Sequence, residues 1–438
     1  MSDFEINDKI LVKYVGDDSE VVIPEGVDEI GTGAFETCTN LKTIKFPESV
    51  TKIGKYAFAK CTNLKTIEIS ESVTEIGEYA FGGCCSLSNI KLPKGITKIG
   101  YLAFSDCSNL KSIEIPEGIT TIYGGTFKNC TSLTSVKLPS SVNIIEKEAF
   151  IYCHCLETIE LSNNIKQIDM NTFEDCTNLT SVKLPAKLTK IARGAFRNCA
   201  SLTRIKIPKN VTEIGASAFS GCVSLTSFDL PKDITKISNK TFYNCNKLEI
   251  IEIPNKVSMV CDSAFENCTN LRAIKIPASV TKIGENAFCN CLKLESVELS
   301  SGLCSIGGRA FANCASLTNI EISESIANVG RCAFAGTGLT SVKIPAGVTK
   351  IAGCTFKGCT SLTSVEISEC VTSICEWAFA GCTSLTNIKI PKSVTKIGDY
   401  AFGGCNNLEK VEILSNINLN KTVFSYCGNF KLCKNNKN

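Results

Sequence analysis

A phenylalanine returns every 23 residues along almost the whole of this 438-residue chain, and this period restricts the possible folds more than any other feature. The series is Phe35, Phe58, Phe81, Phe104, Phe127, Phe150, Phe173, Phe196, Phe219, Phe242, Phe265, Phe288, Phe311, Phe334, Phe356, Phe379, Phe402 and Phe424. Such a period is typical of a solenoid, in which each repeat packs only against its neighbours. The length of the chain therefore does not indicate several globular domains.

Each repeat carries the same pattern of apolar residues, L-x-x-I-x-I-P-x-x-V-x-x-I-G-x-x-A-F-x-x-C-x-x, here written from Leu385. The first segment of the repeat, L-x-x-I-x-I, ends with two isoleucines spaced two residues apart. This spacing is typical of a short strand with inward aliphatic side chains. Ile397, Ala401, Phe402 and Cys405 have the spacing of one face of a helical turn. Each repeat is thus predicted to contain a strand, a turn, a short extended piece and a helical turn.

Proline and glycine residues mark the ends of these predicted elements. All twelve prolines, from Pro24 to Pro391, lie just after the predicted strand. Proline fixes φ and cannot donate a backbone hydrogen bond, so it ends the strand at the same point in every repeat. Gly or Asn usually precedes the repeated cysteine, as at Asn129 and Gly221, and tolerates the left-handed conformation expected at a helix end.

Cysteine also follows the period, three residues after every phenylalanine of the series except Phe334, where Thr337 takes its place. Seventeen of the 27 cysteines are explained in this way. An inward cysteine behaves as a small apolar residue, so these thiols are predicted to be buried and reduced. Cys332 and Cys354 lie at equivalent places in successive repeats and could form a disulfide under oxidation.

The composition fits a packed protein and excludes several classes of function. The chain has 46 basic and 43 acidic residues, a formal charge of +3, and no basic cluster of the kind that binds nucleic acid. No apolar run approaches the roughly 18 to 20 residues of a membrane helix, so no membrane insertion is expected. The first ten residues lack a signal peptide, which reads as a cytoplasmic location.

The repeat resembles that of the BspA-like leucine-rich repeats, the Treponema pallidum type, over roughly residues 20 to 430. The resemblance implies a leucine-rich-repeat fold and, because some members are surface proteins similar to adhesins, a surface protein or adhesin-type binder of other proteins. The missing signal peptide and the many thiols favour an alternative, an intracellular scaffold or regulatory adaptor.

The expected fold class is an α/β repeat solenoid. It is a right-handed leucine-rich-repeat superhelix of about eighteen 23-residue units, with a parallel concave sheet and short helical turns opposite. We expect an N-terminal hairpin cap at 1–20, the solenoid at 21–424, and a C-terminal cap with a polar tail at 425–438. The hairpin is predicted to pair residues 10–14 with residues 20–23.

One outward column of the predicted concave sheet is charged: Lys45, Glu68, Lys91, Glu114, Lys137, Glu160, Lys183, Lys206, Asp229, Glu252, Lys275, Glu298, Glu321, Lys343, Glu366, Lys389 and Glu412. Opposite charges on neighbouring strands favour pairing, so the alternation can serve to fix register. The alternation fails at Lys183/Lys206, Asp229/Glu252 and Glu298/Glu321. A companion column of Ser, Thr and Asn is interrupted by Arg204, Ile250 and Ala273, with Arg272 adjacent. Residues 204–275, and above all Arg204, Ile250 and Arg272, form a candidate binding patch.

Aromatic residues suggest a second candidate surface. Trp377 is the one tryptophan, Tyr400 takes its place in the next repeat, and Tyr56 and Tyr79 take it near the N-terminus. This place lies on the flank of the inward face, so the rings are expected to be partly exposed. They either anchor a partner, as Trp and Tyr often do, or cover apolar surface between repeats.

The sequence argues against an enzyme. His154 is the sole histidine, so a serine or cysteine nucleophile has almost no general base available. The run Cys153-His154-Cys155 lacks the second ligand pair that a zinc site needs. We therefore expect no catalytic residues, no metal and no cofactor, and a partner that is another protein.

Overall fold

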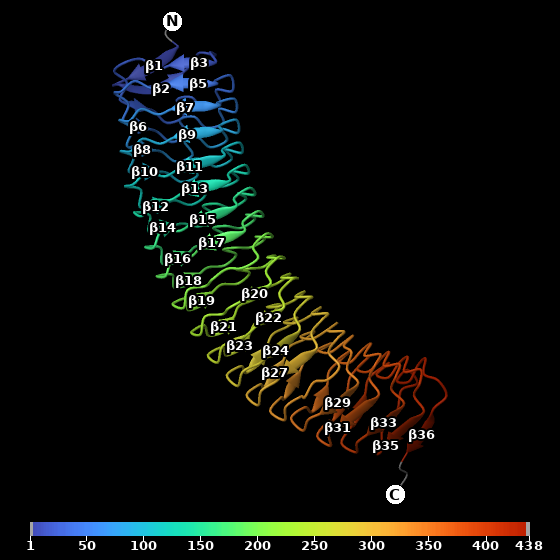
Figure 1. Cartoon of the computed structure of the whole chain (residues 1–438). Coiled ribbons are helices and arrows are strands. Elements are labelled where there is room, and N and C mark those ends of the chain that lie inside the picture. Colours follow the sequence, from blue (N-terminus) through green and yellow to red (C-terminus); the bar gives the residue numbers. More distant parts are fainter. Residues whose placement is uncertain (1–2, 435–438) are drawn as a thin grey trace. The chain divides into compact units, whose positions relative to one another are not determined.

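The computed structural model describes residues 3–434 and divides the chain into two compact units, Met1–Val223 and Ser224–Asn438. Each unit is a β-solenoid in which the strands of successive turns lie side by side (Figure 1). Counted over both units, there are about eighteen turns, one for each 23-residue repeat. The predicted repeat solenoid with parallel sheets is confirmed.

The turns contribute short strands to two parallel ladders, although residues 204–206 and 319–321 form no first strand. In the first unit, the first-strand ladder consists of β3 (Glu20–Val22), β5 (Thr43–Lys45), β7 (Thr66–Glu68), β9 (Asn89–Lys91), β11 (Ser112–Glu114), β13 (Ser135–Lys137), β15 (Thr158–Glu160) and β17 (Ser181–Lys183). The second-strand ladder consists of β4 (Glu29–Ile30), β6 (Lys52–Ile53), β8 (Glu75–Ile76), β10 (Lys98–Ile99), β12 (Thr121–Ile122), β14 (Ile144–Ile145), β16 (Gln167–Ile168), β18 (Lys190–Ile191) and β19 (Glu213–Ile214).

The second unit has the same two ladders. Its first-strand ladder consists of β20 (Ser227–Phe228), β22 (Ile250–Ile251), β24 (Ala273–Lys275), β26 (Ser296–Glu298), β29 (Ser341–Ile344), β31 (Ser364–Ile367), β33 (Asn387–Ile390), β35 (Lys410–Ile413) and β36 (Lys431–Lys434). Its second-strand ladder consists of β21 (Lys236–Ile237), β23 (Met259–Val260), β25 (Lys282–Ile283), β27 (Ser305–Ile306), β28 (Asn328–Val329), β30 (Lys350–Ile351), β32 (Ser373–Ile374) and β34 (Lys396–Ile397).

Register within the ladders follows the sequence repeat. Ile44 pairs with Ile67 and Lys52 pairs with Glu75, so each residue faces its equivalent in the next turn. In most first strands the central aliphatic residue points inward while its two neighbours remain exposed, as in β7. A slip by one residue would bring the charged neighbours into the core, so the alternation of apolar and polar residues fixes the register.

The predicted helical turns are wrong, because residues 3–434 contain no helix. In their place is a series of tight turns whose backbone N–H groups bind the next turn of the solenoid. Tyr56 donates to Glu78 (2.9 Å), and Phe58 donates to Ala80 (2.8 Å). Tyr56 itself has a left-handed φ of 55°, which a helix does not allow. The apolar spacing identified the inward residues correctly, but their amides are engaged between turns and not within a helix.

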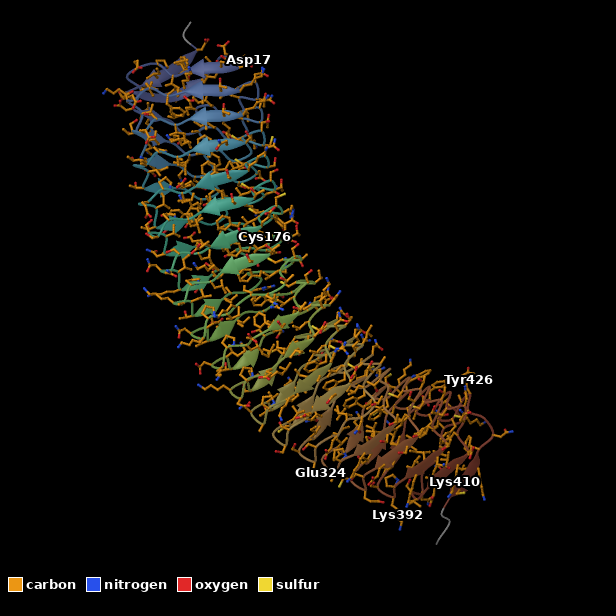
Figure 2. The ribbon with its side chains drawn as sticks, viewed as in Figure 1. Asp17, Cys176, Glu324, Lys392, Lys410 and Tyr426 are labelled. Carbon is orange, nitrogen blue, oxygen red and sulfur yellow. The ribbon has the colours of Figure 1, made fainter. Side chains whose placement is uncertain are left out.

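The phenylalanines of the period form the centre of the core. All of them except the half-buried Phe424 are buried, and their rings stack from turn to turn, for example Phe81 on Phe104 at 5.5 Å and 2°. In the second unit, Phe311 lies on Phe334 at 5.6 Å and 2°. Side chains fill the inside of the turns and project from their outer faces along each unit (Figure 2). Stacking of identical residues therefore supplies the core of every turn.

Except for the half-buried Cys38 and Cys427, the repeated cysteines are buried, and most of them make a specific hydrogen bond. The Sγ of Cys61 donates to the carbonyl oxygen of Phe35 (3.0 Å), which also accepts the backbone N–H of Cys38 (3.1 Å). The same bond to a phenylalanine 25 or 26 residues earlier recurs along both units, for example from Cys382 to Phe356 (3.3 Å). The thiol thus links each turn to the preceding one, a role beyond that of a small apolar residue.

The ends of the chain differ in part from the prediction. The N-terminal hairpin is formed by β1 (Phe4–Asn7) and β2 (Ile10–Tyr14), which pair antiparallel. The predicted pairing of residues 10–14 with 20–23 is wrong, because β3 instead pairs parallel with β5 and is the first rung of its ladder. At the other end β36 pairs parallel with β35. The last four residues of the predicted polar tail, 435–438, lie outside the described residues.

Replacing Phe150 by alanine should lower the free energy of unfolding by about 3 to 5 kcal/mol. Its ring is fully buried and lies between those of Phe127 and Phe173, at 5.4 and 5.5 Å, so the change leaves a cavity in the stack. Urea unfolding followed by circular dichroism measures the loss. Phe150→Leu, which retains more of the volume, should cost less, and a loss below about 1 kcal/mol for alanine would contradict the assignment.

The buried thiols of the repeated cysteines predict a loss of stability at alkaline pH. Burial raises the pKa of Cys61 and of Cys222 to about 12, and the pKa of Cys130 and of Cys153 well above the ordinary 9.0. Because the folded pKa exceeds the unfolded one, this stabilisation is complete below pH 9 and is lost as the pH rises toward 12. The loss is about 1.4 kcal/mol per thiol for each pH unit above 9.

The measurement is urea unfolding between pH 8 and 10.5 in the presence of a reducing agent. The variant Cys130→Ser with Cys153→Ser is the control, since serine can donate the same hydrogen bond and does not titrate in this range. Its free energy of unfolding should fall less steeply than that of the unchanged protein, by about 3 kcal/mol per pH unit. Equal slopes for the two proteins would show that these thiols already ionise in the folded state.

Candidate protein-binding surfaces

The outward side chains of the first-strand ladder form a charged face in each unit. Lys137 Nζ lies 2.5 Å from Glu114 Oε1, and Lys183 pairs with Glu160 in the same way. In the second unit, Lys275 Nζ lies 3.0 Å from Glu298 Oε2. Opposite charges on neighbouring strands therefore do pair at these places, as the alternation predicted. Exposed pairs of this kind contribute little stability, about 0.2 to 1 kcal/mol each.

The pattern of paired charges is broken in the second unit at β20 and β22. Asp229 and Glu252 follow each other in the charged column and are both exposed. Lys275, the next basic residue of the column, pairs with Glu298 on its other side. Neither Asp229 nor Glu252 forms an ion pair with any residue in the range 3–434, so two like charges without a paired cation follow each other in the column.

An exposed isoleucine lies in the same place. Ile250 pairs in register with Ser227 of β20, and 67% of its surface is exposed. It lines a groove of ≈ 650 Å³ together with Ser227, Phe228, Asp229, Leu230, Lys232, Ile251, Glu252, Ile253, Pro254, Asn255 and Lys256. We call this the acidic groove. It combines one exposed apolar side chain with two carboxylates that form no ion pair. Of the two lysines that also line it, Lys256 is paired with Asp233 at 2.5 Å.

The structure places the three predicted patch residues in different units. Arg204 is exposed in the first unit, whereas Ile250 and Arg272 belong to the second. The backbone N–H of Arg272 donates to Glu249, the residue before Ile250, at 3.3 Å, and its guanidinium lies 3.8 Å from Glu295. Ile250 and Arg272 therefore lie on adjoining turns. Arg204 is not part of the acidic groove.

Trp377 and Tyr400 form a close pair in the second unit. Their rings are stacked at 4.5 Å and 15°, and Lys357 Nζ lies 5.0 Å from the centre of the Trp377 ring. Trp377 is 37% exposed and Tyr400 is half-buried, as expected for the flank of the inward face. Because Tyr400 and Lys357 both lie against the indole, it is not a bare aromatic surface.

In the first unit, Tyr56 and Tyr79 occupy the same place in successive turns. Their rings lie 5.6 Å apart and are tilted by 46°, and Tyr56 is exposed. The aromatic rings of successive turns are therefore in contact in both units, stacked in Trp377 and Tyr400 and tilted in Tyr56 and Tyr79.

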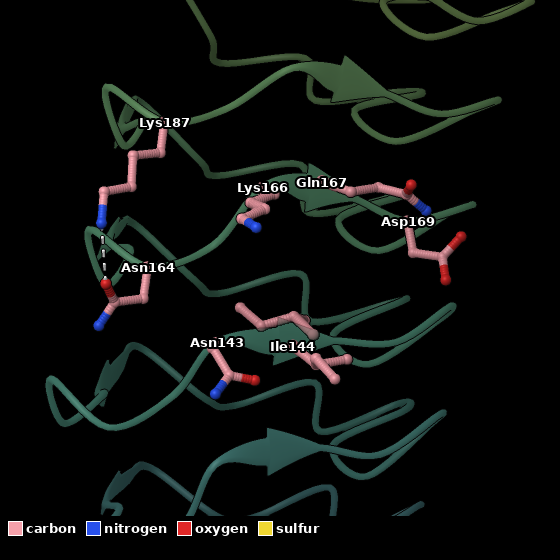
Figure 3. Close-up of a pocket in the computed structure, with 8 residues that line it drawn as sticks. Asn143, Ile144, Asn164, Lys166, Gln167, Asp169 and Lys187 are labelled. Carbon is pink, nitrogen blue, oxygen red and sulfur yellow. Dashed lines mark hydrogen bonds between the residues drawn. The ribbon is translucent and has the colours of Figure 1, made fainter.

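The structure also contains two grooves that the sequence analysis missed, both along the second-strand ladder of the first unit. One measures ≈ 570 Å³ and is lined by Asn143, Ile144, Ile145, Asn164, Lys166, Gln167, Asp169 and Lys187 (Figure 3). Lys187 Nζ donates to Asn164 at its rim (3.4 Å), and Ile144 is 50% exposed. The other measures ≈ 530 Å³ and ends at Tyr101 and Tyr123, whose rings are 4.8 Å apart. A departure from the repeat could have pointed to this second groove, because Tyr123 stands where the motif has glycine.

The run Cys153-His154-Cys155 does not converge on one point. Cys153 is buried and its Sγ donates to Phe127 (3.1 Å), while Nδ1 of His154 lies 2.9 Å from the carbonyl oxygen of Asp175. Within residues 3–434, no group of three or more His, Cys, Asp or Glu side chains is arranged to hold a metal ion. In the same part of the chain, no helix is long and apolar enough to cross a membrane.

The parallel ladders, the stacked apolar columns and the repeat length define a leucine-rich-repeat protein. The family model described as BspA type leucine rich repeat region (6 copies) matches residues 13–134, 120–249, 235–362 and 349–438. These matches span nearly the whole chain, so the chain belongs to the BspA-type leucine-rich-repeat family. Proteins with such repeats are typically binding modules for other proteins and not enzymes. No curated protein matches the sequence.

Solved structures of bacterial leucine-rich-repeat proteins are similar to this chain. A leucine-rich-repeat protein from Bacteroides ovatus is 28% identical with a TM-score of 0.60, covering 98% of this chain and 97% of that one. A leucine-rich cell surface protein from Faecalibacterium prausnitzii is 31% identical with a TM-score of 0.43, covering 83% and 92%. The leucine-rich-repeat protein of T. pallidum is 30% identical with a TM-score of 0.35, covering 45% and 86%.

Proposed function

We propose that this chain binds another protein, and that the acidic groove of its second unit is a principal contact surface. The observation that carries the proposal is the exposed Ile250 beside the unpaired carboxylates of Asp229 and Glu252. Ion pairs join other neighbours in the charged column, Glu114 with Lys137, Glu160 with Lys183 and Lys275 with Glu298, whereas Asp229 and Glu252 stand next to each other with the same charge. Membership of the BspA-type family supports protein binding in general.

The chemistry of the acidic groove favours a partner segment that is basic and carries an apolar side chain. Like charges on neighbouring strands oppose pairing by roughly 0.2 to 1 kcal/mol, so Asp229 and Glu252 impose a small cost on the fold. A lysine or arginine placed between them would remove that repulsion. An aliphatic side chain of the partner could at the same time cover Ile250, which is otherwise in contact with water.

Two settings for such binding remain as hypotheses. An adhesin-type role at a cell surface is what the family suggests. An intracellular scaffold or regulatory adaptor is favoured by the cysteine content, because the 27 cysteines are all thiols in this structure and thiols persist best in a reducing compartment. The proposed contact chemistry is the same in both.

The first test uses immobilised extended peptides that combine leucine with lysine, with glutamate or with serine. We expect the intact protein to prefer the lysine peptide, and the double variant Asp229→Asn with Glu252→Gln to bind it at least tenfold more weakly, since both charges of the acidic groove are lost. Ile250→Ser should weaken binding to all three peptides. Surface plasmon resonance at about 0.15 M salt gives the affinities.

The matched control is Glu321→Gln with Glu366→Gln, which removes two exposed carboxylates from the same column of the same unit but outside the acidic groove. Its affinity for the lysine peptide should stay within about twofold of the unchanged protein. A loss as large as that of the groove variant would indicate attraction by net charge, and the acidic groove would then not be the site.

Trp377 and Tyr400 are the alternative anchor. If this pair is a hot spot, Trp377→Ala with Tyr400→Ala should weaken binding to a partner captured from the host cell by about 2 kcal/mol or more. The control is Tyr56→Ala with Tyr79→Ala, which removes the corresponding pair in the first unit. Isothermal titration calorimetry measures both variants, and circular dichroism checks their fold. Unchanged affinity with an intact fold would leave the acidic groove as the better candidate.

A further inference from the structure

One junction between turns in the second unit is more weakly connected than its neighbours. The second-strand ladder runs without a break from β21 to β28 and again from β30 to β34, but β28 and β30 do not pair. The first-strand ladder is also interrupted there, since no strand forms between β26 and β29. Both ladders are thus open beside the turn that contains Phe334.

The sequence is irregular at the same junction. Only 22 residues separate Phe334 from Phe356, and Thr337 stands where the repeat has its cysteine. Packing is also less complete: a small void lies between the two turns, lined by Ile322, Val329, Ile344, Pro345, Val348, Ile351, Thr355 and Phe356. Val329 is half-buried and stands where the adjoining turns have the larger, buried Ile306 and Ile351.

Besides single hydrogen bonds from Thr340 to Thr318 (3.0 Å) and from Ala346 to Glu324 (2.8 Å), contacts in the turn segment connect the two turns. Cys332 N–H donates to Gly353 (3.0 Å), and Phe334 N–H donates to Thr355 (2.9 Å). The rings of Phe334 and Phe356 are stacked at 5.6 Å and 8°. A covalent bond across this segment would therefore act where the backbone ladders do not.

Two cysteines lie across the junction in matching positions. Cys332 and Cys354 have the same left-handed backbone conformation, with φ of 57° and 58°. The rings of Phe334 and Phe356, which belong to the same two turns, lie 5.6 Å apart, and this spacing is within the range of about 4.4 to 6.8 Å that a disulfide requires between Cα atoms. Burial raises the pKa of Cys354, and the adjacent Cys332 thiol adds to the rise.

Arginine and glutamate side chains bracket this pair. Arg331 Nη2 lies 3.7 Å from the Sγ of Cys354, and its Nη1 donates to Glu376 (2.6 Å) two turns further on. The guanidinium is thereby held beside the sulfur. Most of the repeated cysteines differ from this pair, because they are buried and their Sγ donates to a phenylalanine carbonyl, as that of Cys359 does to Phe334 (3.1 Å).

We propose that Cys332 and Cys354 are a redox-active pair whose disulfide staples the open junction between their two turns. The oxidant is a low-molecular-weight disulfide such as oxidised glutathione. Cys332, the more exposed of the two, loses its proton and attacks one sulfur of the oxidant, forming a mixed disulfide and releasing one small thiolate. Cys354 then loses its proton and attacks the Cys332 sulfur, which releases the second.

Atoms and electrons balance in this exchange. The two protein thiols lose two protons and two electrons and form one S–S bond, while the oxidant disulfide is cleaved and leaves as two small thiols. The guanidinium of Arg331 favours the second step, since a cation beside Cys354 stabilises its thiolate. In the reduced state, the junction is the place where the second unit opens most readily.

The test equilibrates the full-length protein in glutathione buffers of increasing oxidised fraction, blocks free thiols by alkylation and maps disulfides by mass spectrometry. We expect the Cys332 to Cys354 bond to form first, before the exposed Cys304 and Cys370 carry more than mixed disulfides with glutathione. Hydrogen exchange on the same samples should show the amides of Cys332 and Phe334 exchanging at least tenfold more slowly after oxidation.

Cys332→Ser should abolish both the bond and the added protection, whereas Cys370→Ser, which removes an exposed thiol outside the pair, should retain both. If Cys332→Ser does not fold, the unchanged protein with and without dithiothreitol provides the same comparison. The proposal is overturned if another disulfide forms in preference, or if the Cys332 to Cys354 bond forms and the exchange rates stay the same.

Discussion

The structure depends on backbone hydrogen bonds that connect each turn to the next. In the two ladders these bonds join short strands, and in the third segment they join tight turns, as from Phe58 to Ala80. Strands of two to four residues cannot be stable alone, so each turn is ordered only because its neighbours supply partners for its N–H and carbonyl groups. Every residue of the motif is therefore selected for a geometry that repeats from one turn to the next.

This constraint explains why the repeat retains phenylalanine and cysteine together. The phenylalanine ring fills the centre of the turn, and its carbonyl oxygen accepts both its own turn's cysteine N–H and the thiol of the next turn, as Phe35 does from Cys38 and Cys61. Alanine could fill much of the space of cysteine but could not donate a hydrogen bond. Thr337 can donate one, yet its hydroxyl donates to Phe334 in its own turn and not to a phenylalanine of the preceding turn. That turn is also one side of the open junction.

The period made the solenoid, its parallel register and the buried columns predictable, because apolar spacing reports directly which side chains face the core. The tight turns that replace the expected helical turns were not predictable. Residues at i, i+4, i+5 and i+8 point inward both in a helix and in a series of tight turns. The distinguishing signal was Tyr56 and its equivalents with left-handed φ, which a sequence does not display. The second strand of the N-terminal hairpin was misassigned. The alternation of apolar and polar side chains in residues 20–23 fits a hairpin strand and the first strand of a parallel ladder equally well.

The candidate surface was predictable only as far as it departs from the repeat. Ile250 interrupts a column of small polar residues, and Asp229 and Glu252 interrupt an alternation of charge, so both were visible in the sequence. That Lys275 pairs with Glu298 and leaves Glu252 without a cation depends on side-chain positions, which only the structure provides. In a fold where almost every residue is set by its neighbours in adjoining turns, the outward positions of the strands are the ones free to vary. An exposed isoleucine beside two unpaired carboxylates serves no need of the ladder, and it is therefore where selection for a partner can act without loss of the fold.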